Sequence, residues 1–149
     1  MIYFNRNSKD FGSFSNFSIS ILIYKGRLYN CAEAAWQAQK DPSRAEEFVG
    51  LNGSQSKRLG RSVNLRSDWE EIKYFEMVDV LICKFTQNSE LGALLISTGE
   101  EELVEDTTGW HDNIWGCCYC SKCKGKEGKN LLGKALMEVR NILRYGRTK

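Results

Sequence analysis

Residues 24–40 read YKGRLYNCAEAAWQAQK, and we expect the rest of the chain to be organised around them. Lys25-Gly26 predicts a tight turn between two short strands, because glycine accepts the positive φ that such a turn requires. Asn30 is a good N-cap residue, and the alanines that follow favour a helix from Cys31 to Lys40. The stretch therefore predicts a β-hairpin that leads directly into a helix.

One face of this predicted helix has an unusual composition. Spacings of three and four residues place four side chains on it, namely Glu33, Trp36, Gln37 and Lys40. A carboxylate, an indole, an amide and an ammonium group suit a binding or catalytic site better than a core. Glu33 also has a simpler interpretation, because it lies three residues after Asn30, where a capping-box glutamate bonds back to the N-cap amide. The local pattern alone favours capping.

Composition predicts an ordinary globular chain. Its 149 residues, 42% hydrophobic and 27% charged, suit one domain with a single core. A net charge of +2 is too small to indicate nucleic-acid binding by itself. We find neither the apolar core of a signal peptide nor a run long enough to span a bilayer, which predicts a cytoplasmic protein with no membrane partner. In that compartment, cysteines are expected to be thiols or metal ligands.

Periodicity and turn signals predict the remaining elements. We expect strands at residues 2–4, 19–24, 27–29 and 102–105, and helices at 41–50, 54–59, 67–88 and 89–96 and from 130 onward, followed by a frayed basic tail at 145–149. Capping boxes or N-caps are expected at Ser67-Asp68-Trp69-Glu70 and at Asn130. The balance is mostly helical with a few short strands. It predicts a single compact α+β domain over residues 1–149.

A second unusual stretch is WHDNIWG at residues 110–116. Two tryptophans around Asp112 and Asn113 suit a ligand pocket, in which the rings stack on the ligand and the polar groups orient it. The equal alternative is a loop whose aromatic rings fill the core and whose aspartate makes a turn. Both interpretations stay open on the local pattern.

Thiols are dense in the next segment, a cysteine-rich loop at about 117–128. Cys120-x-x-Cys123 has the spacing of a zinc knuckle, and Cys118 is near enough to be a third ligand. Cys117 or His111 would be the fourth. The alternative is free thiols in a lysine-rich loop. Four protein ligands would leave no open position for water, so we expect any zinc here to be structural.

A further stretch, residues 128–135, nearly matches a phosphate-binding loop. It ends in alanine where that motif needs serine or threonine, and no strand precedes it. We therefore reject a nucleotide-triphosphatase signature. Asn130 and Gly133 remain candidates to present backbone amides to a phosphate at the helix start.

Taken in order, a set of motifs resembles the YbiA-like, or NADAR (NAD and ADP-ribose associated), family over nearly the whole chain. The motifs are Phe14-Ser15-Asn16-Phe17, Gly26 to Lys40, Lys57-x-x-Gly60-Arg61, Asp68-Trp69, Lys84-Phe85, Leu103-Val104-Glu105, Asp112-x-x-Trp115-Gly116 and Gly128-x-Asn130-x-x-Gly133. The family usually has histidine after the helix glutamate, whereas this chain has Ala34. The cysteine-rich insert looks like a subgroup feature. Both departures concern the identity of the substrate more than the type of reaction.

The resemblance implies hydrolysis of N-glycosidic bonds in a compact, mostly helical α+β domain. Substrates in the family are ribosylaminopyrimidine phosphates of riboflavin biosynthesis, or ADP-ribose-type nucleotides, including ADP-ribose on guanine bases of nucleic acid. Such cleavage passes through a cationic, oxocarbenium-like ribose, which a carboxylate stabilises. With the family in view, we expect catalysis by Glu33 and Asp112 without a cofactor.

The same resemblance suggests how the substrate is bound. Trp69 or Trp115 could stack on the departing base, and Lys57 and Arg61 could hold phosphate. The full set of expected binding residues is Trp36, Gln37, Lys40, Lys57, Arg61, Trp69, Lys84, Trp115 and Asn130. The alternative is a non-catalytic module that binds ADP-ribose or nucleic-acid ends and carries a zinc-knuckle-like loop.

Overall fold

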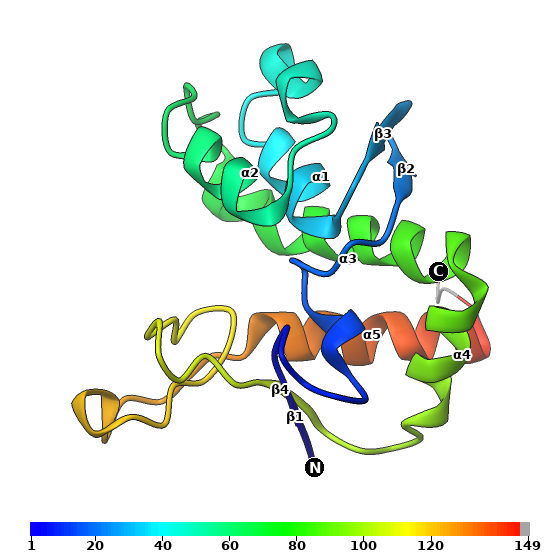
Figure 1. Cartoon of the computed structure of the whole chain (residues 1–149), viewed down its shortest axis with the longest axis vertical. Coiled ribbons are helices and arrows are strands. Elements are labelled where there is room, and N and C mark those ends of the chain that lie inside the picture. Colours follow the sequence, from blue (N-terminus) through cyan, green and yellow to red (C-terminus); the bar gives the residue numbers. More distant parts are fainter. Residues whose placement is uncertain (147–149) are drawn as a thin grey trace.

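Helices are the dominant regular structure, and the strands of the described residues form two short pairs. The structure is a computed structural model that describes residues 1–146. In chain order the elements are β1 (Ile2–Phe4), the 3₁₀ helix η1 (Gly12–Phe14), β2 (Leu22–Tyr24), β3 (Arg27–Tyr29), α1 (Ala32–Ala38), the 3₁₀ helix η2 (Pro42–Phe48), α2 (Gly53–Gly60), α3 (Trp69–Gln87), α4 (Ser89–Ser97), β4 (Leu103–Glu105), the 3₁₀ helix η3 (Ser121–Cys123) and α5 (Leu131–Tyr145) (Figure 1). The predicted frayed tail falls largely on residues 147–149, outside the described range.

The predicted hairpin is confirmed. β2 and β3 pair antiparallel, and the two turn residues, Lys25 and Gly26, have φ of 48° and 79°. Two consecutive positive φ values are those of a type I′ turn, whose twist matches that of paired strands. The other pair joins distant segments, since β1 runs parallel to β4 with Ile2 opposite Leu103.

The core forms around α3. This helix contacts α1 on one side and α5 on the other (Figure 1). Its predicted apolar stripe includes Met77, Leu81 and Phe85, which are at most 1% exposed, and the stripe of α5 contributes Leu136 and Val139 at 0%. The α+β prediction is therefore confirmed. Within the described residues, no helix is long and apolar enough to cross a membrane.

Three details of helix starts differ from the predictions. The N-cap of α1 is Cys31, without a side-chain cap bond, because the N–H of Glu33 donates to the Asn16 carbonyl (3.0 Å). Glu33 is therefore not a capping residue. The predicted box at Ser67 to Glu70 is also absent, since the Asp68 carboxylate accepts bonds from Arg66 at 2.6 and 3.1 Å.

Elsewhere the local geometry also departs from expectation. The segment after Asp41 forms a 3₁₀ helix in place of the predicted α-helix, with non-helical angles at Arg44. At α5, Asn130 occupies the N-cap position in a left-handed conformation (φ 53°) but makes no side-chain cap bond. An unpredicted capping box forms at α2, where Asn52 and Gln55 exchange bonds of 2.8 and 2.9 Å.

Candidate functional site

A buried carboxylate lies at the start of α1. Glu33 is 7% exposed, and its Oε1 accepts a bond of 3.2 Å from Nε2 of Gln37, which is itself 3% exposed. Burial raises the pKa of Glu33, while the Gln37 bond and the positive charges of Lys57 and Lys40 act in the opposite direction. Glu33 is thus an acidic group held in a low-dielectric place beside two ammonium groups.

The cations of the site come from α2 and from the residues that directly follow α1 and α2. A Cβ added to Gly60 would lie 2.0 Å from Gln37 Oε1 and 3.6 Å from Lys40 Nζ, so the end of α2 packs directly on this face of α1. Burial lowers the pKa of Lys40, and the positive charges of Arg61 and Lys57 lower it further while Glu33 raises it. Lys57 and Arg61 are exposed. They form a positively charged rim beside the buried carboxylate.

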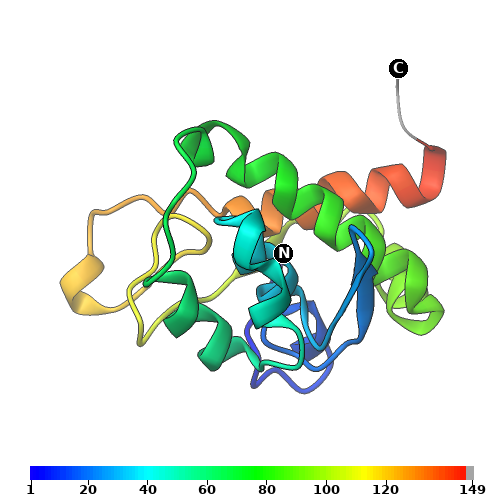
Figure 2. The same ribbon diagram turned by 90° about the horizontal axis from the view of Figure 1, so that it is seen from above.

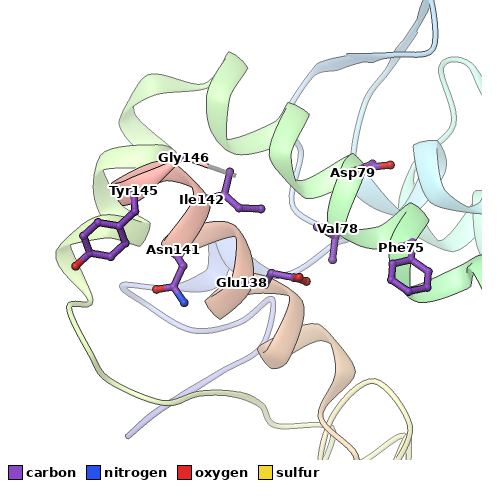
Figure 3. A pocket seen from close by; sticks show the side chains of 8 residues that line it. All are labelled: Phe75, Val78, Asp79, Glu138, Asn141, Ile142, Tyr145 and Gly146. Carbon is purple, nitrogen blue, oxygen red and sulfur yellow. The ribbon is translucent and has the colours of Figure 1, made fainter. Parts of the chain in front are cut away.

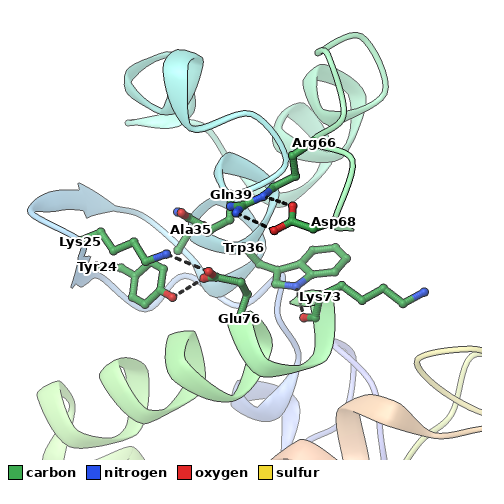
Figure 4. Close-up of polar contacts among 9 residues, drawn as sticks. All are labelled: Tyr24, Lys25, Ala35, Trp36, Gln39, Arg66, Asp68, Lys73 and Glu76. Carbon is green, nitrogen blue, oxygen red and sulfur yellow. Dashed lines mark hydrogen bonds and ion pairs between the residues drawn. The ribbon is translucent and has the colours of Figure 1, made fainter. Parts of the chain in front are cut away.

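Three tryptophans from separate segments meet at this face. The Trp36 ring lies 5.0 Å from that of Trp69 and 5.1 Å from that of Trp115, between centroids. Lys40 Nζ lies 5.6 Å from the Trp36 ring and 6.0 Å from the Trp69 ring. The Trp36 indole N–H donates to the Lys73 carbonyl at 2.9 Å (Figure 4). Trp36 is therefore fixed to α3 and contacts both other rings.

The hairpin is fixed to the same helix. Glu76 of α3 accepts hydrogen bonds from the Tyr24 hydroxyl and, at 2.8 Å, from Lys25 Nζ (Figure 4). These contacts and the Trp36 bond hold the start and middle of residues 24–40 against α3. Residues 24–40 thus both carry part of the site and support it.

Two further carboxyl groups interact electrostatically with Glu33. Asp112 carries one of them, and its Oδ1 accepts bonds of 2.9 Å from the N–H groups of both Ile114 and Trp115. Sequence analysis missed the other, Glu105, at the end of β4. Burial, together with the negative charges of Asp112 and Glu33, raises the pKa of Glu105 to about 8. The sequence did contain one signal for Glu105, because this glutamate ends a predicted strand and belongs to one of the family motifs.

The structure does not bring all expected residues to this site. Lys84 is 0% exposed, and its Nζ donates to the carbonyls of Ser13 (2.6 Å) and Ser15 (3.1 Å). Its predicted contact with substrate phosphate is wrong, because the ammonium group is buried and already bonded inside the core. Burial lowers the pKa of Lys84 to about 7.

Asn130 also has a different environment from the predicted one. Its side chain donates to the Leu103 carbonyl (2.9 Å) and accepts from the Glu105 N–H (3.1 Å). The N–H groups of Leu131 and Leu132 are bonded to the carbonyls of Ile114 and Trp115. Asn130 therefore holds β4 in place. The N–H groups of Leu131 and Leu132 are already bonded, so they are not free to bind a phosphate at the start of α5.

Four side chains of the types that bind metals form a cluster next to the segment that carries Asp112. His111 Nδ1 is 3.5 Å from Cys118 Sγ, 3.2 Å from Cys120 Sγ and 3.5 Å from Cys123 Sγ. All four donor atoms lie within 4.8 Å of one another, so the cluster could hold a metal ion. Of the two alternatives for the fourth ligand, the structure places His111 in the cluster. Cys117 is not one of its members.

Residues 3–144 match the NADAR domain family. The chain belongs to the NADAR domain family. N-glycosidase YbiA of Escherichia coli (strain K12) is 38% identical to this NADAR chain over 148 residues, covering 96% of the chain and 88% of the relative. An N-glycosidase of Nostoc punctiforme is 31% identical over 151 residues, with coverage of 96% and 92%.

A longer relative and a solved structure extend the comparison. A riboflavin biosynthesis protein of Vibrio vulnificus is 33% identical over 147 residues, which cover 95% of this chain and 38% of that protein. The NMR structure of E. coli YbiA matches with a TM-score of 0.81 at 37% identity, covering 96% of this chain and 84% of that one. The NADAR fold is thus confirmed by sequence and by structure.

An open groove lies elsewhere on the molecule. It runs between α3 and α5 and is lined by Phe75, Val78, Asp79, Glu138, Asn141, Ile142, Tyr145 and Gly146 (Figure 3). None of its lining residues belongs to the carboxylate site or to the His/Cys cluster. We assign no role to this groove.

Proposed function

We propose that this chain is an N-glycosidase that cleaves the bond between ribose and base in a ribose-phosphate or ADP-ribose-type nucleotide. The observation that carries the proposal is the buried Glu33, which interacts electrostatically with the carboxyls of Asp112 and Glu105 and with the ammonium groups of Lys40 and Lys57. Relatives that are N-glycosidases or riboflavin biosynthesis proteins support the same reaction type. Candidate substrates are ribosylaminopyrimidine phosphates and ADP-ribosylated guanine, free or in nucleic acid.

The three carboxyl groups suit the steps of such a hydrolysis. When the bond between ribose C1′ and the base nitrogen breaks, the electron pair leaves with the base and the ribose becomes cationic. Ionised Glu33 stabilises this cation, and Glu33 or Asp112 accepts the proton of the water that adds to C1′. Glu105, protonated near neutral pH because its pKa is about 8, supplies a proton to the departing base.

Substrate binding uses the groups around these carboxyls. Trp115, the least buried of the three clustered tryptophans, stacks on the base, with Trp69 and Trp36 as its support. Lys57 on α2 and Arg61 just after it bind the phosphate. Gln37 and Lys40 fix Glu33 and the near edge of the ribose.

No cofactor is assigned to the reaction itself. The described chain has free cysteines at 31, 83, 117, 118, 120 and 123, which fits a reducing compartment. We therefore propose the cytoplasm as the site of action. A structural zinc ion would belong to the His/Cys cluster and take no part in bond cleavage.

A screen for released base tests the function. Purified protein is incubated with ribosylaminopyrimidine phosphates, NAD, ADP-ribose and ADP-ribosylated guanine, and the products are identified by mass spectrometry. We expect base release from at least one substrate by the wild type and none by Glu33→Ala. Binding without release, unchanged in Glu33→Ala, would instead identify a non-catalytic module for ADP-ribose or nucleic-acid ends.

A further inference from the structure

We propose that His111 Nδ1 and the thiolates of Cys118, Cys120 and Cys123 bind one Zn²⁺ tetrahedrally, and that this ion fixes the loop that carries Asp112 and Trp115. The site lies outside the carboxylate cluster and supplies no group to the reaction. Three independent features support it: the spacing of the donor atoms, the local fold of the loop, and the placement of the ligands around the functional segment.

The donor spacing is that of a tetrahedral ion. Zinc–sulfur bonds of about 2.3 Å and zinc–nitrogen bonds of about 2.0–2.1 Å place sulfur and nitrogen about 3.5 Å apart in a tetrahedron. The three distances from His111 Nδ1 to the sulfurs are 3.5, 3.2 and 3.5 Å. Since all donors lie within 4.8 Å of one another, one ion fits between them and a cluster of several iron atoms does not.

The choice of metal follows from the donors. Three thiolates and one imidazole form a soft ligand set, of the kind that structural zinc sites use and that calcium and magnesium do not. Three thiolates and Zn²⁺ carry a net charge of −1. Exposed lysines of the same loop, Lys122, Lys124 and Lys126, offset that charge locally.

The backbone already forms the turn that a zinc knuckle needs. Between two of the ligands lies η3, where the Cys123 N–H donates to the Cys120 carbonyl at 3.1 Å. The Lys126 N–H then donates to the Cys123 carbonyl at 2.9 Å. These bonds point both thiols toward His111 without the help of apolar packing.

Cys117 is adjacent in sequence but separate in space. Its backbone joins β4, with its N–H bonded to the Glu105 carbonyl (2.8 Å) and its carbonyl to the Thr107 N–H (3.0 Å). A Cβ added to Gly128 would lie 2.6 Å from Cys117 Sγ, so this thiol faces Gly128. Cys117 therefore offers a matched control, a thiol of the same loop that does not bind the ion.

The ligands hold both ends of the functional segment. His111 and Cys118 directly flank residues 112–117, and the Cys118 N–H donates to Asn113 Oδ1 at 2.9 Å. Within the segment, the Asp112 carbonyl accepts a bond of 2.6 Å from the Thr107 hydroxyl. An ion bound by His111 and Cys118 thus fixes the positions of Asp112 and Trp115 from both sides.

Few contacts other than the proposed metal bonds stabilise residues 119–129 of this loop. It projects from the helical part of the molecule in both overall views (Figures 1 and 2). Between residues 119 and 129, only Cys123 is buried. A segment that buries so little surface cannot offset the entropy of a fixed backbone, whereas a metal can.

Metal content tests the site directly. Protein produced without a metal-binding tag should contain about one zinc per chain by elemental analysis. Replacement by Co²⁺ should give the intense visible bands of tetrahedral cobalt–thiolate coordination. Cys118→Ser, Cys120→Ser and Cys123→Ser should each lower zinc content at least tenfold, and Cys117→Ser should keep it at the wild-type level. The wild-type measurements do not depend on whether any variant folds.

Several outcomes would overturn the proposal. These are wild-type protein that folds without metal and has freely titrating thiols, a disulfide among the four cysteines of residues 117–123 detected by mass, or equal zinc loss in Cys117→Ser. These tests need no substrate, so they can contradict the zinc proposal without affecting the N-glycosidase proposal. A zinc-loaded protein that cleaves none of the nucleotides would contradict only the proposed function.

Discussion

The two sides of the carboxylate site are built in opposite ways. The helix side, α1 and α2, is fixed by packing: all seven residues of α1 are buried, and Gly60 of α2 lies directly on Gln37. The loop side, residues 107–129, is fixed by backbone bonds, by Asp112 and by the His/Cys cluster. Glu33 therefore lies on a side that is fixed by core packing. Asp112 and Trp115 lie on a loop whose order depends largely on polar contacts.

Substitutions on the two sides should therefore have different effects. A helix side that the core holds should keep its geometry when a single polar group is changed, so such changes report on chemistry. A loop side held by few contacts should lose geometry first, so changes there report on positioning. The expected effects on turnover are therefore largest for the buried carboxyls, smaller for the exposed phosphate rim and smallest for the loop.

The largest effect is expected from Glu33→Gln. The amide keeps the shape and removes the charge, so kcat should fall by about a hundredfold or more. Because burial disfavours the ionised form of Glu33, its replacement should leave the thermal midpoint unchanged or raise it. Steady-state kinetics and a melting curve measure both, with Glu71→Gln on exposed α3 surface as the control. Turnover near the wild-type value would show that Glu33 is not the essential carboxylate.

The next effect concerns Glu105, at the boundary of the two sides. Its pKa of about 8 keeps it protonated at neutral pH, and its proton is lost as the pH rises through that value. As a proton donor it should make kcat/KM fall above about pH 8. Glu105→Gln should lower kcat/KM by about tenfold to a hundredfold and abolish this alkaline decline.

Folding stability gives a second measurement on the same carboxyl. The folded pKa of Glu105 lies above its ordinary value of 4.5, so the folded state binds more protons between pH 4.5 and about 8. Its contribution to stability is therefore present below this window and is lost as the pH rises through it. In denaturant melts, the free energy of unfolding should decline less with rising pH in Glu105→Gln than in the wild type. Exposed Glu102→Gln is the control, and an unchanged pH profile in Glu105→Gln would contradict the assignment.

A smaller effect is expected for the phosphate rim. Arg61→Ala should raise KM by about tenfold for a phosphorylated substrate and much less for its dephosphorylated analogue, because a charge-assisted bond is lost only in the first case. Arg58→Ala, also exposed on α2, is the matched control. Equal changes with both substrates would indicate a structural role for Arg61.

The sequence predicted what depends on local pattern. The hairpin, the helix that carries Glu33 and the apolar stripe of α3 all follow from turn chemistry and periodicity, and the structure confirms them. It also singled out Trp36, Trp69 and Trp115, although no local signal shows that their rings would meet. Family resemblance, and not spacing, placed them in one site.

What the sequence could not predict depends on distant contacts. The helix start at Glu33 is satisfied by the carbonyl of Asn16, which no capping rule anticipates. Lys84 looked like a phosphate ligand, but its acceptors lie about 70 residues away in the chain and enclose it. Burial raises the pKa of Glu105 most, and the charges of Asp112 on the loop and Glu33 on α1 raise it further. Each of these outcomes requires the assembled structure.

The smallest effect on turnover is expected from removal of the proposed zinc, and it separates the two sides most clearly. Chelation should increase hydrogen exchange of the amides of Ile114, Trp115 and Cys118, which donate to the side chains of Asp112 and Asn113 within the loop. The amides of α1 should keep their protection, since all seven residues of this helix are buried in the core. Because Glu33 stays in place while Asp112 and Trp115 become mobile, kcat/KM should fall by only about fivefold, which is under 1.4 kcal/mol of barrier. Re-addition of Zn²⁺ should restore both the exchange pattern and the rate, and Cys117→Ser should respond as the wild type does. If α1 lost protection together with the loop, the two sides would be one cooperative unit and the comparison would be wrong.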